Sequence, residues 1–172
     1  NNIPTMALTK NTILSHKEIE HKIRRISYQI YESNVNETEI VIAGIESNGY
    51  ILAKKIKSQL DKISDINSTL CKVTVDKNEP INPIKTSIKS EDYANKSIVL
   101  IDDVLNSGST LIYGIKHFLD VPLKQFKTAV LVNRNHKKFP VKADFKGISL
   151  STSLFEHVHV NLSKQPYEAY LD

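Results

Sequence analysis

The stretch that decides the fold is residues 97–110, which read SIVLIDDVLNSGST. Its first five residues form a short apolar run with β-branched side chains, the pattern of a strand buried on both faces. Two acids and a small polar segment around Gly108 come next, and Leu111, Ile115 and Phe118 then recur at helical spacing. The stretch therefore predicts a strand, a polar loop and a helix, in that order.

The same order of elements is expected on the N-terminal side. Residues 40–45 form another apolar, β-branched run, followed by a polar loop at 46–49 and a helix that reaches residue 63. Further upstream, Ser15 and Glu18 have the spacing of a capping box, and four isoleucines follow on one helical face. This pattern predicts an amphipathic helix that begins near residue 16.

Further strands are expected at residues 70–75 and 128–132, and two prolines make residues 76–95 mostly loop. Strands that alternate with helices at this spacing form right-handed crossovers and a parallel sheet with helices on both faces. We therefore expect an α/β fold in a single domain, residues 1–172, closed by an irregular and more polar C-terminal third.

The composition restricts the class of protein. With 172 residues, 40% of them hydrophobic and 24% charged, the chain can bury the core of one domain, which excludes a disordered or fibrous protein. No apolar run reaches the roughly 18 residues of a membrane span and no secretory leader is recognisable, so we expect a soluble cytoplasmic protein. Cys71 is the single cysteine, which excludes an internal disulfide and argues against a cysteine-rich zinc site. The formal net charge of +4 permits an anionic partner without requiring one.

The loop behind residue 101 carries the candidate chemistry, because ligands of open parallel sheets bind at the carboxyl ends of the strands. Residues 106–110 are small and polar around one glycine, so their backbone N–H groups can point into one concavity at a helix start, which favours a phosphate. Asp102 and Asp103 would repel that phosphate, and their natural partners are ribose hydroxyls and Mg²⁺. From spacing alone, a polar helix-entry turn whose aspartates cap backbone amides fits equally well.

The segment from Val99 to Leu111 resembles the phosphoribosyl-diphosphate (PRPP) signature of type I phosphoribosyltransferases, which has an apolar strand, two acids and a serine- or threonine-glycine turn. Within that superfamily the whole chain is similar to the pyrimidine-operon attenuator and uracil phosphoribosyltransferase family. The resemblance implies a Rossmann-like parallel sheet flanked by helices, with a small hood over the active site. We expect the hood within residues 133–172, a poorly defined N-terminal segment at residues 1–12, and a homodimer or higher homo-oligomer.

The resemblance also implies a reaction, the transfer of the 5-phosphoribosyl group between PRPP and a nucleobase with release of pyrophosphate. A uracil-type pyrimidine is the first base to consider, and Mg²⁺ is the implied cofactor. Asp102 and Asp103 would hold the ribose hydroxyls and Mg²⁺ and stabilise the positive charge of the transition state. The implied PRPP-binding residues are Asp102, Asp103, Val104, Leu105, Asn106, Ser107, Gly108, Ser109 and Thr110; the pyrophosphate loop is Glu46, Ser47, Asn48 and Gly49; the base pocket is Val132, Asn133, Arg134 and Phe145.

The chain departs from the family pattern at three places, and each departure removes positive charge or reach from the pyrophosphate site. The pyrophosphate loop of the family commonly carries a lysine and an arginine, but residues 46–49 read ESNG. An arginine that is common after the signature glycine is Ser109 here. The flexible loop of the family corresponds to residues 75–80, VDKNEP, in which Lys77 is the remaining cation. A catalytically inactive protein that senses PRPP therefore stays open as an alternative.

An RNA-binding pyrimidine-operon regulator is a second alternative, because the resembled family includes members that bind messenger RNA through a basic surface. The modest net charge and the lack of an aromatic-basic RNA motif weigh against this alternative. The candidate basic patch for such binding consists of His136, Lys137, Lys138, Lys142 and Lys146.

Two histidines, His157 and His159, share a strand face and could coordinate a metal, but no third ligand is recognisable nearby, so a solvated face is favoured.

Overall fold

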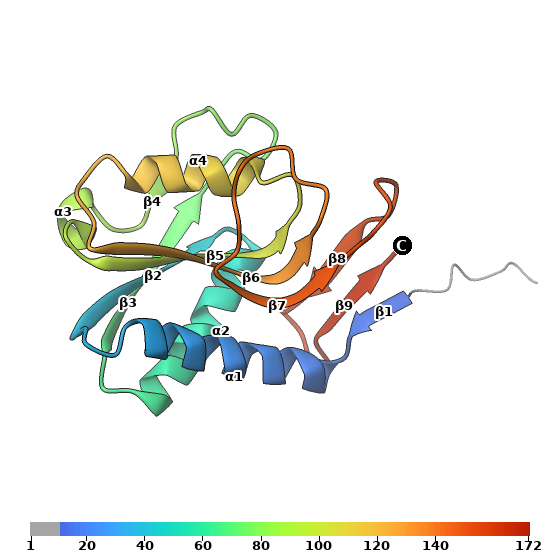
Figure 1. Ribbon diagram of the computed structural model, residues 1–172, viewed down its shortest axis with the longest axis horizontal. Coiled ribbons are helices and arrows are strands. Elements are labelled where there is room, and N and C mark those ends of the chain that lie inside the picture. The colour runs from blue at the N-terminus through green and yellow to red at the C-terminus, as the bar shows by residue number, and fades with distance from the viewer. Residues whose placement is uncertain (1–10) are drawn as a thin grey trace, which may run out of the picture.

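The computed structural model describes residues 11–172, so the first ten residues of the expected N-terminal segment lie outside it. A six-stranded sheet of order β4-β3-β2-β5-β6-β7 forms the centre, and a three-stranded sheet of order β1-β9-β8 lies at one end of the molecule (Figure 1). In chain order the elements are β1 (Asn11–Leu14), α1 (His16–Ser33), β2 (Glu39–Ile45), α2 (Asn48–Ile63), β3 (Asn67–Thr74), β4 (Lys85–Thr86), α3 (Ser90–Tyr93), β5 (Ser97–Leu105), α4 (Ser109–Phe118), β6 (Gln125–Arg134), β7 (Phe145–Leu150), β8 (Val158–Asn161) and β9 (Glu168–Leu171).

The large sheet is parallel except at one edge. Strand β2 pairs in parallel with β3 and β5, and β6 pairs in parallel with β5 and β7, whereas the short β4 runs antiparallel to β3. Helices α1 and α2 cover one face of this sheet and α4 covers the other (Figure 1). The α/β fold expected from the sequence, with a parallel sheet and helices on both faces, is therefore confirmed.

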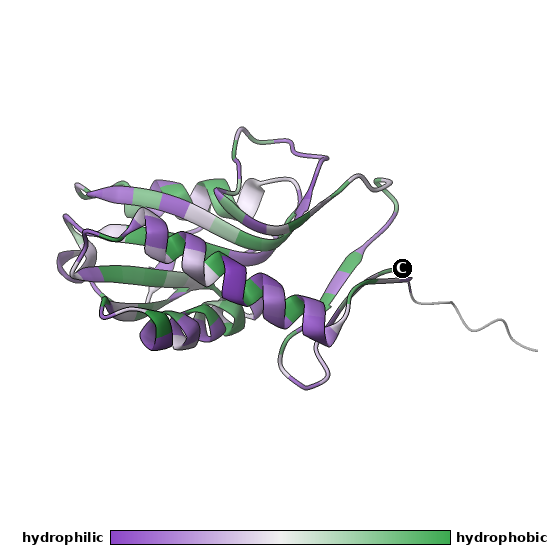
Figure 2. Ribbon diagram, turned by 60° about the horizontal axis from the view of Figure 1, so that its bottom comes forward, coloured by the Kyte–Doolittle hydropathy of each residue, from purple (hydrophilic) through white to green (hydrophobic). Residues whose placement is uncertain are grey.

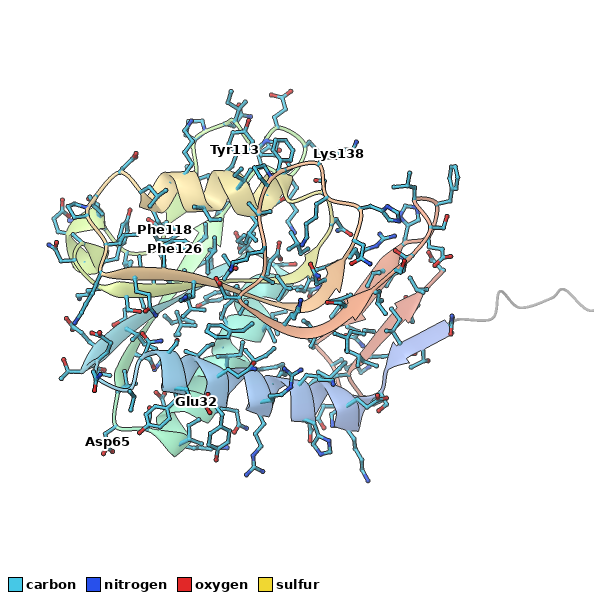
Figure 3. The ribbon with its side chains drawn as sticks, viewed as in Figure 1. Glu32, Asp65, Tyr113, Phe118, Phe126 and Lys138 are labelled. Carbon is cyan, nitrogen blue, oxygen red and sulfur yellow. The ribbon has the colours of Figure 1, made fainter. Side chains whose placement is uncertain are left out.

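Each face of the large sheet has its own apolar layer. The capping box is present, since the Glu18 N–H donates to Ser15 Oγ (3.3 Å) and the Ser15 N–H donates to Glu18 Oε1 (3.1 Å). The four isoleucines of α1 are buried against the sheet and α2, and Figure 2 shows the matching hydrophilic and hydrophobic bands along this helix. On the opposite face, Phe118 of α4 and Phe126 of β6 lie side by side with ring centroids 5.8 Å apart (Figure 3).

Within residues 11–172, no helix is long and apolar enough to cross a bilayer.

The expectation of an irregular C-terminal third is wrong. Strand β7 extends the large sheet, and β8 and β9 pair in antiparallel fashion. The third strand of the small sheet is β1, in which Asn11 is opposite Leu171 of β9. These strands are short, and β1 and β9 lie at opposite ends of the described chain, so local hydrophobic periodicity could not reveal the small sheet. Of the segment 133–172 expected to form the hood, Phe145–Leu150 thus belongs to the large sheet, while the small sheet also takes Asn11–Leu14.

Candidate functional site

The parallel strands β2 and β5 end at the same edge of the large sheet, and a polar loop follows each of them. A cavity of about 400 Å³ opens behind the end of β5. Its wall contains every residue that was expected to bind PRPP, together with the following Leu111 and three residues from other segments. The lining residues are Lys77, Asp102, Asp103, Val104, Leu105, Asn106, Ser107, Gly108, Ser109, Thr110, Leu111, Val130 and Val158.

The turn before α4 has the backbone shape that an anion-binding concavity needs. Gly108 is the N-cap residue of α4 and has φ = 89°, a left-handed conformation that favours glycine. The carbonyl of the preceding Ser107 accepts the N–H groups of Lys138 and Phe139 at 2.8 and 3.1 Å, so the β6–β7 loop supports the turn from outside. In Figure 3, Lys138 lies on the same side of the molecule as Tyr113 of α4. The first N–H groups of a helix lack intrahelical partners and favour an anion.

The acidic pair belongs to the same cavity wall. Asp102 is buried, and its Oδ1 accepts the N–H of Asp103 at 2.8 Å. Burial raises the pKa of Asp102 well above its usual value, and the charge of Asp103 raises it further, whereas Lys77 lowers it. The Asp103 side chain is only partly buried, and its Oδ2 accepts a hydrogen bond from Asn48 Nδ2 at 3.2 Å. The two carboxyl groups therefore differ in environment, although they are neighbours in the sequence.

A magnesium ion fits this pair only together with a substrate. In residues 11–172, no group of three His, Cys, Asp or Glu side chains is placed to hold a metal ion. Mg²⁺, however, is commonly held by one or two carboxylates plus substrate phosphate oxygens and water. Asp103 faces the cavity beside Asp102, so the donor set matches that second kind of site.

The loop that was expected to hold pyrophosphate, residues 46–49, reaches the same edge of the sheet. The Glu46 carboxylate is directed toward β3, where its Oε2 accepts the Thr74 hydroxyl at 2.8 Å. Gly49 lets the first turn of α2 approach β5, because a Cβ at this position would lie 2.7 Å from the Ile101 carbonyl oxygen. Ser47 is exposed and makes no side-chain cap to α2. None of the four residues lines the cavity, but Asn48 contacts Asp103, which does line it.

The structure does not bring together the four residues expected in the base pocket. Val132 is fully buried, and Phe145 packs on the same apolar cluster as Val132. Asn133 is also buried and donates to Ser149 Oγ at 3.2 Å, while its Oδ1 has no partner within residues 11–172. Of these four, only Arg134 borders a described cavity.

Arg134 is a buried cation that holds neighbouring loops together. Its guanidinium donates to Thr152 Oγ1 at 2.9 Å and to Asn106 Oδ1 at 3.3 Å. It also donates to the carbonyl oxygens of Ser153 at 3.0 Å and Glu156 at 2.7 Å. Since these acceptors come from the phosphate turn and from the segment before β8, Arg134 fixes the two segments relative to each other.

A second hollow of about 400 Å³ adjoins the first and shares Asn106, Ser107 and Val158 with it. Sequence reasoning missed this hollow, because its wall combines the β6–β7 loop with β8 and has no local signal. His159 is on this wall, and its Nε2 lies 2.8 Å from Asp172 Oδ2. The lining residues are Asn106, Ser107, Arg134, His136, Lys138, Leu154, His157, Val158 and His159.

Comparisons with known proteins identify the family of the chain. The family model for the phosphoribosyl transferase domain matches residues 9–165. The chain belongs to the phosphoribosyltransferase family. Among the curated relatives of this phosphoribosyltransferase are proteins named "Bifunctional protein PyrR". The one from Macrococcus caseolyticus is 30% identical over 164 residues, covering 91% of this chain and 94% of the relative. The one from Fusobacterium nucleatum is 32% identical over 169 residues, covering 92% and 94%. The resemblance to the pyrimidine-operon attenuator and uracil phosphoribosyltransferase family is thus confirmed.

Solved structures of phosphoribosyltransferases share this fold. A hypoxanthine-guanine phosphoribosyltransferase from Bacillus anthracis has a TM-score of 0.77 at 18% identity, covering 96% of this chain and all of that one. The hypoxanthine phosphoribosyltransferase of Trypanosoma cruzi has a TM-score of 0.74 at 11% identity, covering 94% and 95%. At these identities the likeness establishes the fold alone.

Proposed function

We propose that this protein transfers the 5-phosphoribosyl group between PRPP and a nucleobase, with a uracil-type pyrimidine as the first base to test. The observation that carries the proposal is the single cavity that joins Asp102 and Asp103 to the turn at Gly108. In its wall, the acids would offer carboxylates to sugar hydroxyls, and the turn would offer backbone N–H groups to a phosphate. A phosphorylated ribose has the same two kinds of group in the same molecule.

The 5-phosphate would bind to the backbone N–H groups of residues 106–110, at the N-terminal end of α4. Charge-assisted hydrogen bonds of this kind contribute about 1.5–3 kcal/mol each. The dipole of α4 favours an anion at this end, and the left-handed Gly108 begins the helix in the cavity wall. The hydroxyls of Ser107, Ser109 and Thr110 also line the wall and can add further donors.

The ribose hydroxyls would bind to Asp103, with Asp102 behind it. These two residues would also hold Mg²⁺, which when bound neutralises the charge of the departing pyrophosphate. At the anomeric carbon, the bond to the pyrophosphate oxygen breaks and a bond to the base nitrogen forms, while the N–H proton of the base passes to the released pyrophosphate or to solvent. The transition state has oxocarbenium character, and a carboxylate near the ribose stabilises its positive charge.

Lys77 would contact the pyrophosphate. It lines the cavity, and its charge acts on Asp102. It would thereby supply positive charge that residues 46–49 lack. The Glu46 carboxylate is bonded to Thr74, so its negative charge would not face the leaving group. The second hollow is where we place the base, since it adjoins the phosphate turn and is lined by Arg134 and side chains near β8.

Calorimetry with PRPP and Mg²⁺, followed by pyrophosphate-release assays over a panel of pyrimidine and purine bases, tests the proposal. We expect binding and base-dependent release, and we expect Asp103→Asn to abolish one or both. Asp65→Asn is the matched control, because Asp65 is exposed and lies on the far side of the molecule from Lys138 (Figure 3). Binding without release for every base would replace the enzyme with a PRPP sensor, and absence of binding would contradict both functions.

RNA binding is a second candidate function, and the exposure of the basic patch favours it. All five residues of the patch are exposed, and four of them lie on the loop between β6 and β7. We expect structured RNA to bind with an affinity that falls steeply as salt rises, because lysine–phosphate contacts release counterions. Filter binding with Lys137→Glu, and with Lys62→Glu at the distant end of α2 as control, checks this. Equal RNA affinity in both variants, or no salt dependence, would remove the second function.

Oligomeric assembly also belongs to the proposal, since the resembled family forms dimers or higher oligomers. Sedimentation measurements with and without PRPP would check it. We expect a homodimer, and a monomer at all accessible concentrations would contradict that expectation.

A further inference from the structure

Asn48 was expected in the pyrophosphate loop, but it makes two hydrogen bonds that such a role does not explain. Its Nδ2 lies 3.2 Å from Asp103 Oδ2 and 3.0 Å from the carbonyl oxygen of Val160. A carboxamide nitrogen carries two hydrogens, so both oxygens can be served at once. Asn48 thereby joins the first turn of α2, the end of β5 and the small sheet.

We propose that Asn48 is a positioning residue, which holds the Asp103 carboxylate at the cavity and fastens β8 over the carboxyl edge of the large sheet. The role of Asp103 in this inference rests on the proposed function. The attachment of β8 does not, because it follows from the contact between Asn48 and Val160 alone.

The carboxylate of Asp103 needs a neutral donor at this place. Asp102 is its direct neighbour in sequence, and two adjacent carboxylates repel each other. The backbone N–H of Asp103 is donated to Asp102 Oδ1, and the donor to the Asp103 carboxylate comes from another element, through Asn48. Asn48 provides that donor without adding a cation, and a neutral donor does not compete with Mg²⁺ or with the positive charge of the transition state, which the proposed function assigns to these acids.

The carbonyl group of Val160 needs a donor for a different reason. Strand β8 is an edge strand of the small sheet, with β9 on one side only. Alternate carbonyls of an edge strand face away from the sheet and must bond to side chains or water. The bond from Asn48 therefore sets the position of β8, and with it the position of Val158, which lines both cavities.

The position of Asn48 is itself well defined. It is the first residue of α2, and the following Gly49 allows the backbone there to approach Asp102 and Ile101 closely. A short side chain on a helix start has few rotamers with which to reach both acceptors. The two contacts therefore depend on how closely α2 packs against β5.

The test compares Asn48→Asp, Asn48→Ser and Asn48→Gln with Asn36→Asp, which adds the same charge at an exposed turn. Asn48→Asp removes both donors and faces Asp103 with a third carboxylate, and Asn48→Ser removes the reach to Val160. Asn48→Gln keeps the amide on a longer stem. Circular dichroism establishes folding for each variant, and Asn48→Ser carries the test if Asn48→Asp does not fold.

Two measurements separate the parts of the inference. Without any ligand, we expect hydrogen exchange of residues 158–161 to speed up at least tenfold in Asn48→Asp and Asn48→Ser, and to stay unchanged in Asn36→Asp. With Mg²⁺ and PRPP, we expect a tenfold or greater loss of affinity in Asn48→Asp and partial recovery in Asn48→Gln. Where turnover is measurable, we expect kcat to fall more than KM rises, because the misplaced Asp103 acts mainly in the transition state.

Unchanged exchange of residues 158–161 in both Asn48→Asp and Asn48→Ser would overturn the attachment of β8. Unchanged PRPP affinity in Asn48→Asp, in a protein whose parent chain binds PRPP, would overturn the positioning of Asp103. A parent chain that does not bind PRPP at all would contradict the proposed function, and the exchange measurement would then decide the remaining part of the inference by itself.

Discussion

Gly108 and Asp102 show at the scale of single residues that the site and the stability of the fold make different demands. Gly108 has a left-handed backbone, and a Cβ there would come within 2.5 Å of Val141 Cγ2. Asp102 is a buried carboxyl whose neighbour is a second carboxyl. A fold selected for stability alone would prefer neither feature. Both features lie in the wall of the cavity.

Gly108→Val is expected to lower both stability and PRPP affinity. A β-branched residue in the left-handed region costs about 1–3 kcal/mol, and the contact with Val141 adds to that cost. Relief of this strain must shift the turn at the start of α4, so its N–H groups no longer converge. Urea unfolding and PRPP calorimetry measure the two effects. A Gly108→Val protein that binds PRPP as well as its parent would disprove the role of the turn.

Asp102→Asn is expected to raise stability at neutral pH while abolishing turnover. Because the pKa of Asp102 is raised in the folded state, the ionised group costs stability as pH rises through the unfolded-state value toward the folded-state value. In strong acid both states are protonated and the cost disappears. The asparagine Oδ1 can still accept the Asp103 N–H, and the gain at pH 7 should be roughly 0.5–2 kcal/mol. Urea titrations at pH 3 and pH 7 measure it, and a variant that is less stable than its parent at pH 7 would refute the argument.

At the scale of elements, the loop after β3 brings a cation to a site that is otherwise poor in positive charge. Asp76 Oδ1 accepts the N–H groups of Asn78 and Glu79 at 3.0 and 3.1 Å, and its Oδ2 accepts Asn82 Nδ2 at 3.1 Å. These three bonds form a compact turn around an exposed carboxylate and lower the pKa of Asp76. Lys77 follows Asp76 directly and lines the cavity, so the turn fixes where this lysine projects.

Lys77→Ala is expected to weaken pyrophosphate and PRPP binding without affecting the fold. Lys77 is exposed, so the loss should be modest, roughly 1 kcal/mol or about fivefold in affinity. The free energy of unfolding should change by less than about 0.5 kcal/mol, as is usual for surface substitutions. Calorimetry with pyrophosphate and urea unfolding measure both, with Lys62→Ala on α2 as the control. Identical pyrophosphate affinity in the two variants would exclude Lys77 from the site.

The elements that sequence reasoning predicted correctly are those with strong local signals. The capping box and the isoleucine period predicted α1, and the apolar runs at residues 40–45 and 97–101 predicted two central strands. The expected phosphate turn and acids also meet in one cavity. The base pocket could not be predicted in the same way, because Val132 and Phe145 point into the core, and the second hollow depends on how β8 is placed by distant contacts. Strand β8 has only four residues, and its pairing with β9 is set by tertiary structure.

At the scale of the whole molecule, the small sheet is built from both ends of the described chain. Leu14 of β1 is opposite Ala169 of β9, and both are buried in the apolar cluster that also contains α1 and α2. His16, at the start of α1, accepts the Tyr167 N–H at 2.9 Å and links the helix to the segment before β9. The small sheet is therefore packed into the main core, and its strands share the stability of that core.

Leu14→Ala is expected to destabilise the protein by about 2–5 kcal/mol, since it removes a side chain that is only 1% exposed from a close-packed cluster. PRPP should restore part of this loss, because a ligand that binds only the folded state stabilises it by mass action. Thermal unfolding with and without PRPP measures both effects. Val35→Ala, at an exposed position, is the control. A loss below about 1 kcal/mol for Leu14→Ala would show that the small sheet is not anchored through this residue.

The pairing of β1 with β9 has a consequence for how the protein is made. During synthesis, residues 11–14 leave the ribosome early, but their partner strand at residues 168–171 emerges only after the entire large sheet has been translated. The nascent chain can therefore complete the central sheet while β1 still lacks its partner. Both cavities must also wait for residues 168–171, since β8, which contributes Val158 to both walls, pairs with β9.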